Sequence, residues 1–266
     1  MSQRVTYKLD DAGVAHVRLV WAERRNAIDP AMVEQLADAV RVCEHARVRA
    51  VLLSADGPAF SVGGDMRHFA AHSADIRGQL ATMVPAYHET LETLATIDAP
   101  VVAAVHGAVA GGGLGLVWCS DIVLAAEGTR FATGFSKLGL SGDGGSSWWL
   151  PRLVGLARAR QMLIAGAVID ALQAHEWGLI AEVLPPGQLA ARSAHVATAL
   201  AQGPTFTLGR MRRLLVASAP LDLGEALARE TAAILECAEQ TDAAEGVSSF
   251  VEGRTPNFNR RGVDDG

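Results

Sequence analysis

The stretch Ala99-Pro-Val-Val-Ala-Ala-Val-His-Gly-Ala-Val-Ala-Gly-Gly-Gly113 carries the pattern that decides the fold. Its residues 101–105 form a short run rich in β-branched side chains, which is typical of a buried strand. The glycines at 111–113 then form a turn into a second apolar segment, which ends near Ser120 and reads as a helix. A strand, a glycine turn and a helix in succession predict one unit of a fold in which helices cover a mostly parallel sheet.

The same alternation recurs on both sides of this stretch. Strands are predicted at 14–20, 50–54 and 122–126, and helices at 30–43 and 80–97. The helix at 30–43 has a clear start signal, because Asp29 suits its N-cap and Pro30 suits its first position. These repeated β and α units predict an α/β fold.

The character of the sequence changes after Pro185-Pro-Gly187, where Ala- and Leu-rich helical segments continue to Ala244. The apolar residues of these segments recur with a helical period, and no strand pattern interrupts them. We therefore expect a core domain over residues 1–200 and an all-helical region over 201–266, which ends in a tail at 257–266.

Composition excludes several classes of function. Half of the 266 residues are hydrophobic, and the net charge of −6 without a Lys/Arg run argues against nucleic-acid binding. The three cysteines lie far apart, which argues against disulfides and metal sites. The N-terminus lacks the apolar run of a signal peptide, and the one uncharged stretch, 99–119, contains Pro100 and a run of glycines that disfavour a membrane span. We expect a cytoplasmic protein without a metal or a membrane partner.

Two glycine-rich loops follow predicted strands in the same manner, one at 59–66 and the other at 106–115. Glycine lets a backbone approach a ligand closely, and a glycine turn that opens a helix directs free N–H groups outward. Two such loops could hold one oxyanion between them. The alternative is that the glycines only permit close packing of helix on sheet. A nucleotide-phosphate loop is disfavoured, because no Gly-x-x-x-x-Gly-Lys-Ser/Thr motif occurs.

A single carboxylate, Asp143, stands in the stretch 139–153 among glycines, serines, Trp148 and Trp149. A carboxylate partly withdrawn from water in such a loop suits proton transfer. The tryptophans could face an aromatic ligand or belong to the core. The alternative for Asp143 is a role in the turn, because Gly-Asp-Gly is also favourable turn chemistry.

Other polar residues have two interpretations each. His106 could act as a base, although a histidine at the end of an apolar strand more often bonds to the backbone. Arg24, Arg25 and Arg67 lie near strand-end turns and could hold phosphates, or they are solvated surface charges.

Taken together, these motifs identify a resemblance to the crotonase, or enoyl-CoA hydratase/isomerase, superfamily over nearly the whole chain. The matching blocks are residues 24–28, 51–66, 99–113, 119–121, 150–155 and 245–258. The resemblance implies a core of repeated ββα turns wound into a superhelix, a C-terminal helical region used to form trimers, and an acyl-CoA thioester substrate. It implies no cofactor beyond the coenzyme A that the substrate carries.

The resemblance also assigns roles to residues. Backbone N–H groups of Gly64 and Gly112 would form the oxyanion hole for the thioester carbonyl. Asp65, Met66 and Arg67 would contact coenzyme A, and Arg24 or Arg25 would meet its adenosine end.

The chain departs from the hydratase pattern at both acid positions. It has Gly115 where hydratases carry one glutamate, and Gly134-Phe135 where they carry a Pro-Glu pair. Asp143 instead falls where isomerases and dehalogenases of the superfamily place a working aspartate. The pattern around it is most similar to the ring-epoxide and Δ3,Δ2-enoyl-CoA isomerases of phenylacetate breakdown, although Gly142 replaces a proline usual in that branch.

The sequence therefore favours an isomerase in which Asp143 shuttles a proton while Gly64 and Gly112 stabilise the enolate. One rival is a hydratase that recruits Glu89 or Glu92, or another crotonase chemistry such as dehalogenation or hydrolysis. A second rival is an acyl-CoA-binding protein without catalysis. The expected assembly is a homotrimer or a dimer of trimers.

Overall fold

The structure, a computed structural model of the whole chain, describes residues 2–45, 47–218 and 221–258. Its centre is a six-stranded sheet in the order β1-β2-β3-β4-β6-β9. The strands are β1 (Val5–Leu9), β2 (Val14–Leu19), β3 (Ala50–Ala55), β4 (Val101–Val105), β6 (Ile122–Ala126) and β9 (Glu182–Leu184). Only the β1–β2 pair of this sheet is antiparallel. The predicted mostly parallel α/β arrangement is therefore confirmed.

A second, three-stranded sheet lies beside the first. Its strands are β5 (Ala108–Ala110), β7 (Arg130–Ala132) and β8 (Val168–Asp170), in that order. The sequence had predicted that the turn at 111–113 follows β4 through a loop alone. In the structure β5 comes between them, because residues 108–110 pair in parallel with β7.

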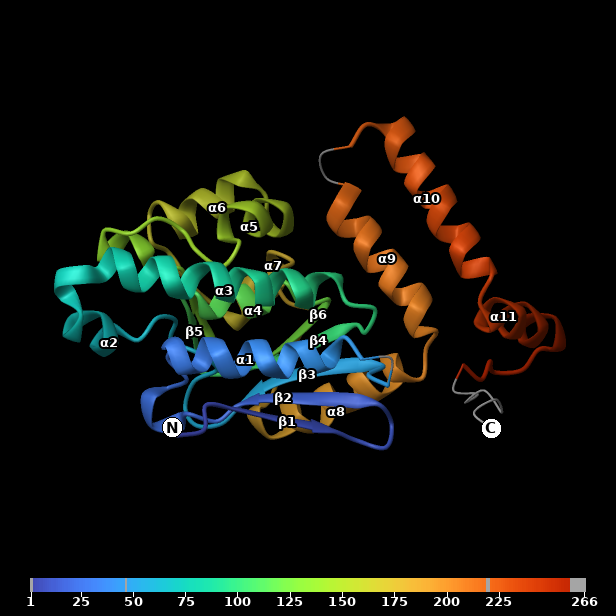
Figure 1. Cartoon of the computed structure of the whole chain (residues 1–266), viewed down its shortest axis with the longest axis horizontal. Coiled ribbons are helices and arrows are strands. Elements are labelled where there is room, and N and C mark those ends of the chain that lie inside the picture. The colour runs from blue at the N-terminus through green and yellow to red at the C-terminus, as the bar shows by residue number, and fades with distance from the viewer. Residues whose placement is uncertain (1, 46, 219–220, 259–266) are drawn as a thin grey trace.

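Helices cover both faces of the large sheet, as Figure 1 shows. On one face lie α1 (Pro30–Cys43) and α3 (Ile76–Thr96), whose apolar sides join the larger hydrophobic core. On the other face α8 (Pro186–Ala201) packs Leu189 and Ala197 against the strands. Because both faces are covered at the centre of the sheet, the parallel strands β4 and β6 are apolar throughout. The edge strand β1 and its neighbour β2 instead alternate and carry polar residues.

Local signals explain where these helices begin. The Asp29 side chain accepts a hydrogen bond from the Met32 N–H at 2.8 Å, and Pro30 occupies the first turn, as the sequence predicted. Shorter elements complete the core: η1 (Ala22–Arg24), α2 (Met66–Ala71), η2 (Ser73–Asp75), α4 (Gly113–Trp118), η3 (Phe135–Leu138), α5 (Ser146–Val154), α6 (Leu156–Leu163) and α7 (Ala171–Glu176).

Three helices after α8 form an arm that projects from the core: α9 (Thr205–Ser218), α10 (Leu223–Ala238) and α11 (Thr241–Glu252). Arg212 fastens α9 to the core, since its buried guanidinium donates to the Leu94 carbonyl at 2.6 Å and to Asp121 at 2.8 Å. Most of the predicted tail at 257–266 lies outside the described residues.

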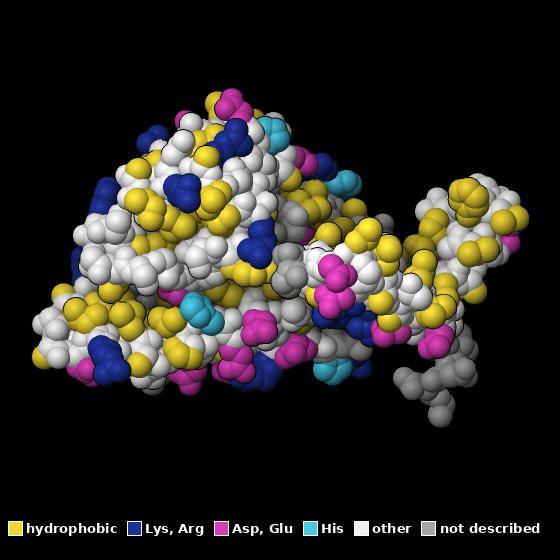
Figure 2. All heavy atoms as spheres, turned by 90° about the horizontal axis from the view of Figure 1, so that it is seen from above, with side chains coloured by type: hydrophobic (Ala, Val, Ile, Leu, Met, Phe, Trp, Pro, Cys, Tyr) yellow, Lys and Arg dark blue, Asp and Glu magenta, His cyan; other side chains and the backbone are white. Residues whose placement is uncertain are grey.

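The arm exposes many large apolar side chains, and Figure 2 shows them gathered along it. Phe250 is 88% exposed and Val251 is 80% exposed, and the others are Met211, Leu215, Leu223, Leu227, Ile234, Leu235 and Val247. Apolar surface of this extent usually marks an interface. Among the described residues, no helix has both the length and the apolar character to cross a membrane.

Candidate active site

A cavity of about 550 Å³ opens between α3 and the loops at one end of the strands. Its walls are mostly apolar and include Ile28, Met66, Phe69, Leu80, Val84 and Phe135. Gly64, Gly112 and Asp143, three residues that the sequence singled out, all line it. The fold therefore brings together the two glycine loops and the carboxylate.

The first glycine loop is held by backbone pairing with the segment before α1. Ile28 donates its N–H to the Gly63 carbonyl at 2.8 Å, and Asp65 donates its N–H to the Ile28 carbonyl at 2.9 Å. Gly63 has a φ of 79°, a left-handed conformation that favours glycine. Between these two bonds, the Gly64 N–H donates no hydrogen bond to any described residue.

The second glycine loop opens α4. Gly111 has a φ of 51° and donates its N–H to the Ala132 carbonyl at 3.0 Å, which ties this loop to the end of β7. The Gly112 carbonyl accepts from the Gly115 N–H at 2.9 Å and from the buried Tyr87 hydroxyl at 2.6 Å. The N–H of Gly112, like that of Gly64, has no acceptor among the described residues.

The two loops touch. A methyl group on Gly63 would lie 2.8 Å from the Ala110 carbonyl oxygen and 3.2 Å from the Gly112 nitrogen. Gly64 and Gly112, whose N–H groups have no acceptor among the described residues, therefore belong to adjacent segments and line one cavity. Two unpaired donors of this kind can bind a carbonyl oxygen and stabilise the negative charge that develops on it.

Asp143 stands across from this pair. A methyl group on Gly112 would lie 3.4 Å from the Asp143 Oδ2 atom. The other oxygen, Oδ1, accepts from the Gly144 N–H at 2.7 Å and lies 2.6 Å from the His88 Nε2 atom. The turn interpretation also holds, because the Ser146 N–H donates to the Asp143 carbonyl at 3.1 Å. Asp143 thus shapes its loop and presents one oxygen toward the glycine loops.

Sequence reasoning missed His88, which comes from α3, 55 residues before Asp143. Its side chain is 47% exposed, and that of Asp143 is 28% exposed. A signal was available in the helical period, because Val84, His88 and Leu91 recur at intervals that place them on one face of a helix.

Tyr87, the neighbour of His88, is a second residue that the sequence did not suggest. Burial, with smaller contributions from Cys119 and Asp143, raises the pKa of Tyr87 well above its ordinary value. The phenol therefore remains a neutral donor to Gly112 throughout the physiological range.

The positions at which hydratases carry acids are filled differently. A methyl group on Gly115 would lie 2.6 Å from the Leu91 Cδ1 atom and 3.2 Å from the Gly144 Cα atom, so no side chain fits there without movement. Phe135 places a ring in the cavity wall. Glu89 and Glu92, the alternative acids, are exposed on α3 and are not part of the cavity wall.

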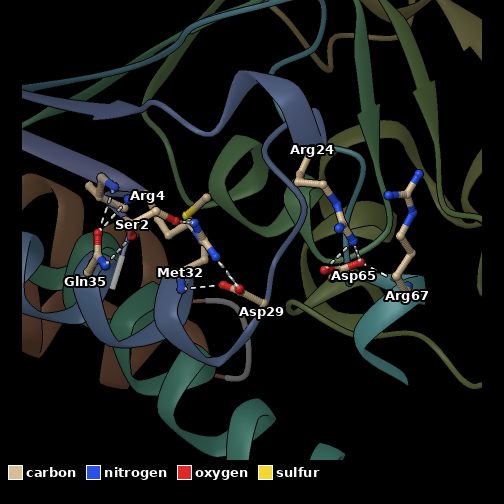
Figure 3. Close-up of polar contacts among 9 residues, drawn as sticks. Ser2, Arg4, Arg24, Asp29, Met32, Gln35, Asp65 and Arg67 are labelled. Carbon is tan, nitrogen blue, oxygen red and sulfur yellow. Dashed lines mark hydrogen bonds and ion pairs between the residues drawn. The ribbon is translucent and has the colours of Figure 1, made fainter. Parts of the chain in front are cut away.

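Of the residues expected to meet coenzyme A, Asp65, Met66 and Arg67 lie at the start of α2, whereas Arg24 and Arg25 lie at the end of η1. Figure 3 shows the contacts of Arg24, Asp65 and Arg67. Arg24 donates through Nη2 to both oxygens of the buried Asp65, at 2.6 and 2.8 Å. Asp65 also caps α2 by accepting from the Arg67 N–H at 3.0 Å. Met66 lines the cavity, whereas Arg25 and the Arg67 side chain are exposed.

Other candidates from the sequence lie elsewhere. His106 bonds through Nε2 to the Gly57 carbonyl at 2.9 Å, and it is not part of the cavity wall. Trp148 and Trp149 pack edge to face with ring centroids 4.4 Å apart, and Trp149 lies against the core. Neither tryptophan lines the cavity.

Comparisons with known proteins identify one family. The family model described as Enoyl-CoA hydratase/isomerase matches residues 10–261. A probable enoyl-CoA hydratase of Rhodobacter capsulatus is 34% identical over 97% of this chain and 98% of its own. The 1,2-epoxyphenylacetyl-CoA isomerase of Escherichia coli is 34% identical over 93% of this chain and 95% of its own.

The fold is also similar to solved structures. The crystal structure of a putative enoyl-CoA hydratase/isomerase from Mycobacterium abscessus matches with a TM-score of 0.90 and 37% identity. The match covers 96% of this chain and 98% of that one.

Proposed function

The chain belongs to the enoyl-CoA hydratase/isomerase family of the crotonase superfamily, and from this premise we propose that it is an enoyl-CoA isomerase whose acid-base residue is Asp143. The observation that carries the proposal is the single carboxylate oxygen facing Gly112, next to two unpaired N–H groups in one cavity. One carboxylate is enough to move a proton between two carbons.

The mechanism begins with the thioester carbonyl oxygen bound by the N–H groups of Gly64 and Gly112. These donors acidify the α-carbon, because they stabilise the enolate more than the thioester. Asp143 takes the α-proton on Oδ2 and returns it to the γ-carbon, while the double bond moves from the β,γ to the α,β position. Each donor contributes about 3 kcal/mol to lowering the barrier.

Hydration is disfavoured by the same geometry. Adding water across a double bond requires a group that activates the water and a group that protonates the α-carbon. Gly115 and Phe135 supply neither at the positions where hydratases carry acids. The mostly apolar cavity suits a hydrocarbon acyl group, either linear or aromatic.

Coenzyme A would extend from the cavity past α2. Met66 would contact it directly, and the exposed Arg25 and Arg67 are available for its phosphates. Arg24 would act through Asp65, which it already binds. We also propose that the apolar face of α9–α11 mediates trimer formation, because it exposes more apolar surface than a lone chain normally does.

The test of the isomerase compares two substrates. Wild type, Asp143→Asn and the control Asp11→Asn are incubated with 3-enoyl-CoA and with 2-enoyl-CoA, and the absorbance of the conjugated thioester is followed. We expect wild type and the control to convert the first substrate and Asp143→Asn to be at least about a hundredfold slower. Asp11 is an exposed residue outside the cavity, so its replacement controls for the loss of a carboxylate. Hydration of 2-enoyl-CoA that survives Asp143→Asn would contradict the proposal.

The His88–Asp143 contact favours one second candidate, the hydrolytic removal of a halide from an aromatic acyl-CoA. Oδ2 of Asp143 would bond to the ring carbon as the halide leaves, and water would then cleave the resulting ester while His88 takes its proton. Halide release from a halobenzoyl-CoA, measured with an ion-selective electrode, separates this reaction from isomerisation.

A further inference from the structure

Helix α3 carries two neighbouring side chains, Tyr87 and His88, that contact different loops of the site. Tyr87 bonds to Gly112 in the oxyanion loop, and His88 contacts Asp143 in the opposite loop. We propose that Tyr87 and His88 are positioning residues that together hold the Gly112 N–H and the Asp143 carboxylate in one working geometry. This inference rests on the isomerase function proposed above and names the residues that support it.

Tyr87 fixes the oxyanion side. The whole residue is only 3% exposed, and its hydroxyl donates to the Gly112 carbonyl at 2.6 Å. Gly112 has no side chain with which to anchor itself, so the hydrogen bonds that its carbonyl accepts help to hold the residue, and with it the N–H that it carries, in place. The second bond to that carbonyl, from the Gly115 N–H at 2.9 Å, belongs to the same turn and cannot tie the loop to another element. Tyr87 supplies that tie.

His88 makes the two oxygens of Asp143 different. Oδ1 lies 2.6 Å from His88 Nε2 and 2.7 Å from the Gly144 nitrogen, whereas Oδ2 meets no donor among the described residues. A carboxylate oxygen that accepts hydrogen bonds is less basic than one that accepts none. The His88 contact and the Gly144 N–H therefore occupy Oδ1 and leave Oδ2, the oxygen that faces Gly112, free to meet the substrate.

The two contacts are coupled through the packing of the loops. A methyl group on Gly115 would lie 3.2 Å from the Gly144 Cα atom, so the turn that carries Gly112 touches the loop that carries Asp143. Because Tyr87 and His88 are neighbours in one helix, the α3 backbone sets the spacing between donor and acid. The Tyr87 and His88 contacts from α3 thus restrain both the loop of Gly112 and the loop of Asp143.

The test measures kcat and KM for 3-enoyl-CoA in wild type, Tyr87→Phe, His88→Leu, His88→Gln and the double variant Tyr87→Phe/His88→Leu. The matched controls are Tyr7→Phe and His195→Gln, which remove the same groups outside the cavity wall. His88 is half exposed, so its replacement leaves the core intact, and the melting temperature of every variant is measured first.

We expect His88→Leu to lower kcat at least about tenfold with KM within about twofold, because positioning acts on the transition state. His88→Gln should recover to within about threefold of wild type, because its amide can donate to Oδ1. Tyr87→Phe should lower kcat about fivefold, and the double variant should lose less than the product of the single losses.

Three results overturn the inference alone while isomerisation stands: kcat within about twofold of wild type in His88→Leu and Tyr87→Phe, losses confined to KM, or His88→Gln as slow as His88→Leu. A wild-type protein that does not convert 3-enoyl-CoA overturns the proposed function and this inference with it. The activity of the wild-type protein therefore tests the proposed function, and the variants then test the positioning roles of Tyr87 and His88.

Discussion

Replacing Gly63 by alanine tests the contact between the two glycine loops, and Gly128 supplies a matched control. Both glycines have a φ of 79°, so both alanine variants incur the same left-handed backbone penalty of about 1–2 kcal/mol. The surroundings differ. A methyl group on Gly128 meets nothing within 4 Å, whereas one on Gly63 lies 2.8 Å from the Ala110 carbonyl oxygen and 3.2 Å from the Gly112 nitrogen.

The difference between the variants isolates the clash. Forcing a methyl group into a packed site costs about 1–3 kcal/mol, so Gly63→Ala should lose about 2–5 kcal/mol of unfolding free energy in total. Gly128→Ala should lose only the backbone part. Because the added methyl group would press on the Ala110 carbonyl and also reach the Gly112 nitrogen, Gly63→Ala should displace one oxyanion donor and lower kcat up to about a hundredfold.

Urea unfolding of both variants gives the free energies, and conversion of 3-enoyl-CoA gives kcat. If Gly63→Ala were no less stable than Gly128→Ala and kept the wild-type kcat, the two loops would not meet as described. A loss of stability without a loss of kcat would keep the loop contact and remove its role in catalysis.

Two further predictions concern buried ionisable groups. Burial raises the pKa of Cys43 and of Cys119 from the ordinary value of 9.0 to about 12, so between these values the unfolded chain binds fewer protons than the folded one. The unfolding free energy should therefore fall as pH rises above about 9, and urea titrations should show a smaller fall in Cys119→Ala. Separately, Arg24→Ala should lower the unfolding free energy by about 3 kcal/mol, because it leaves the buried Asp65 without its ion pair. Replacement of the exposed Arg25 by alanine should change only the KM for the acyl-CoA. Equal unfolding free energies of the two variants in urea titrations would contradict this prediction.

Four strands of the large sheet, β2, β3, β4 and β6, were predicted from sequence, and the structure changes their limits by one residue at 14–19 and at 50–55. The edge strands β1 and β9 were not predicted, because the first mixes polar with apolar residues and the second has only three residues. The small sheet was not predicted either. Its strands β5, β7 and β8 have three residues each, too few for any period to appear, and β5 lies within a segment read as a glycine loop. Pairing with β7, a tertiary event, makes it a strand.

The same distinction separates the site residues that sequence could predict from those it could not. Loops that follow parallel strands end at the same edge of a sheet, so the convergence of Gly64 and Gly112 follows from local pattern alone. Tyr87 and His88 act across the gap between a helix and two loops. Nothing within α3 indicates which residues they will meet.

The loop that carries Asp143 also bears on why hydratase acids are absent. The resemblance places one hydratase glutamate at Gly115, and that position is closed, with Leu91 and Gly144 both within 3.2 Å of where a Cβ atom would stand. Gly144 directly follows Asp143 and donates its N–H to the Asp143 carboxylate. A side chain at Gly115 would therefore displace the end of Leu91 and press on the backbone that presents Asp143 to the cavity. In this chain packing as well as residue type disfavours a second acid at Gly115.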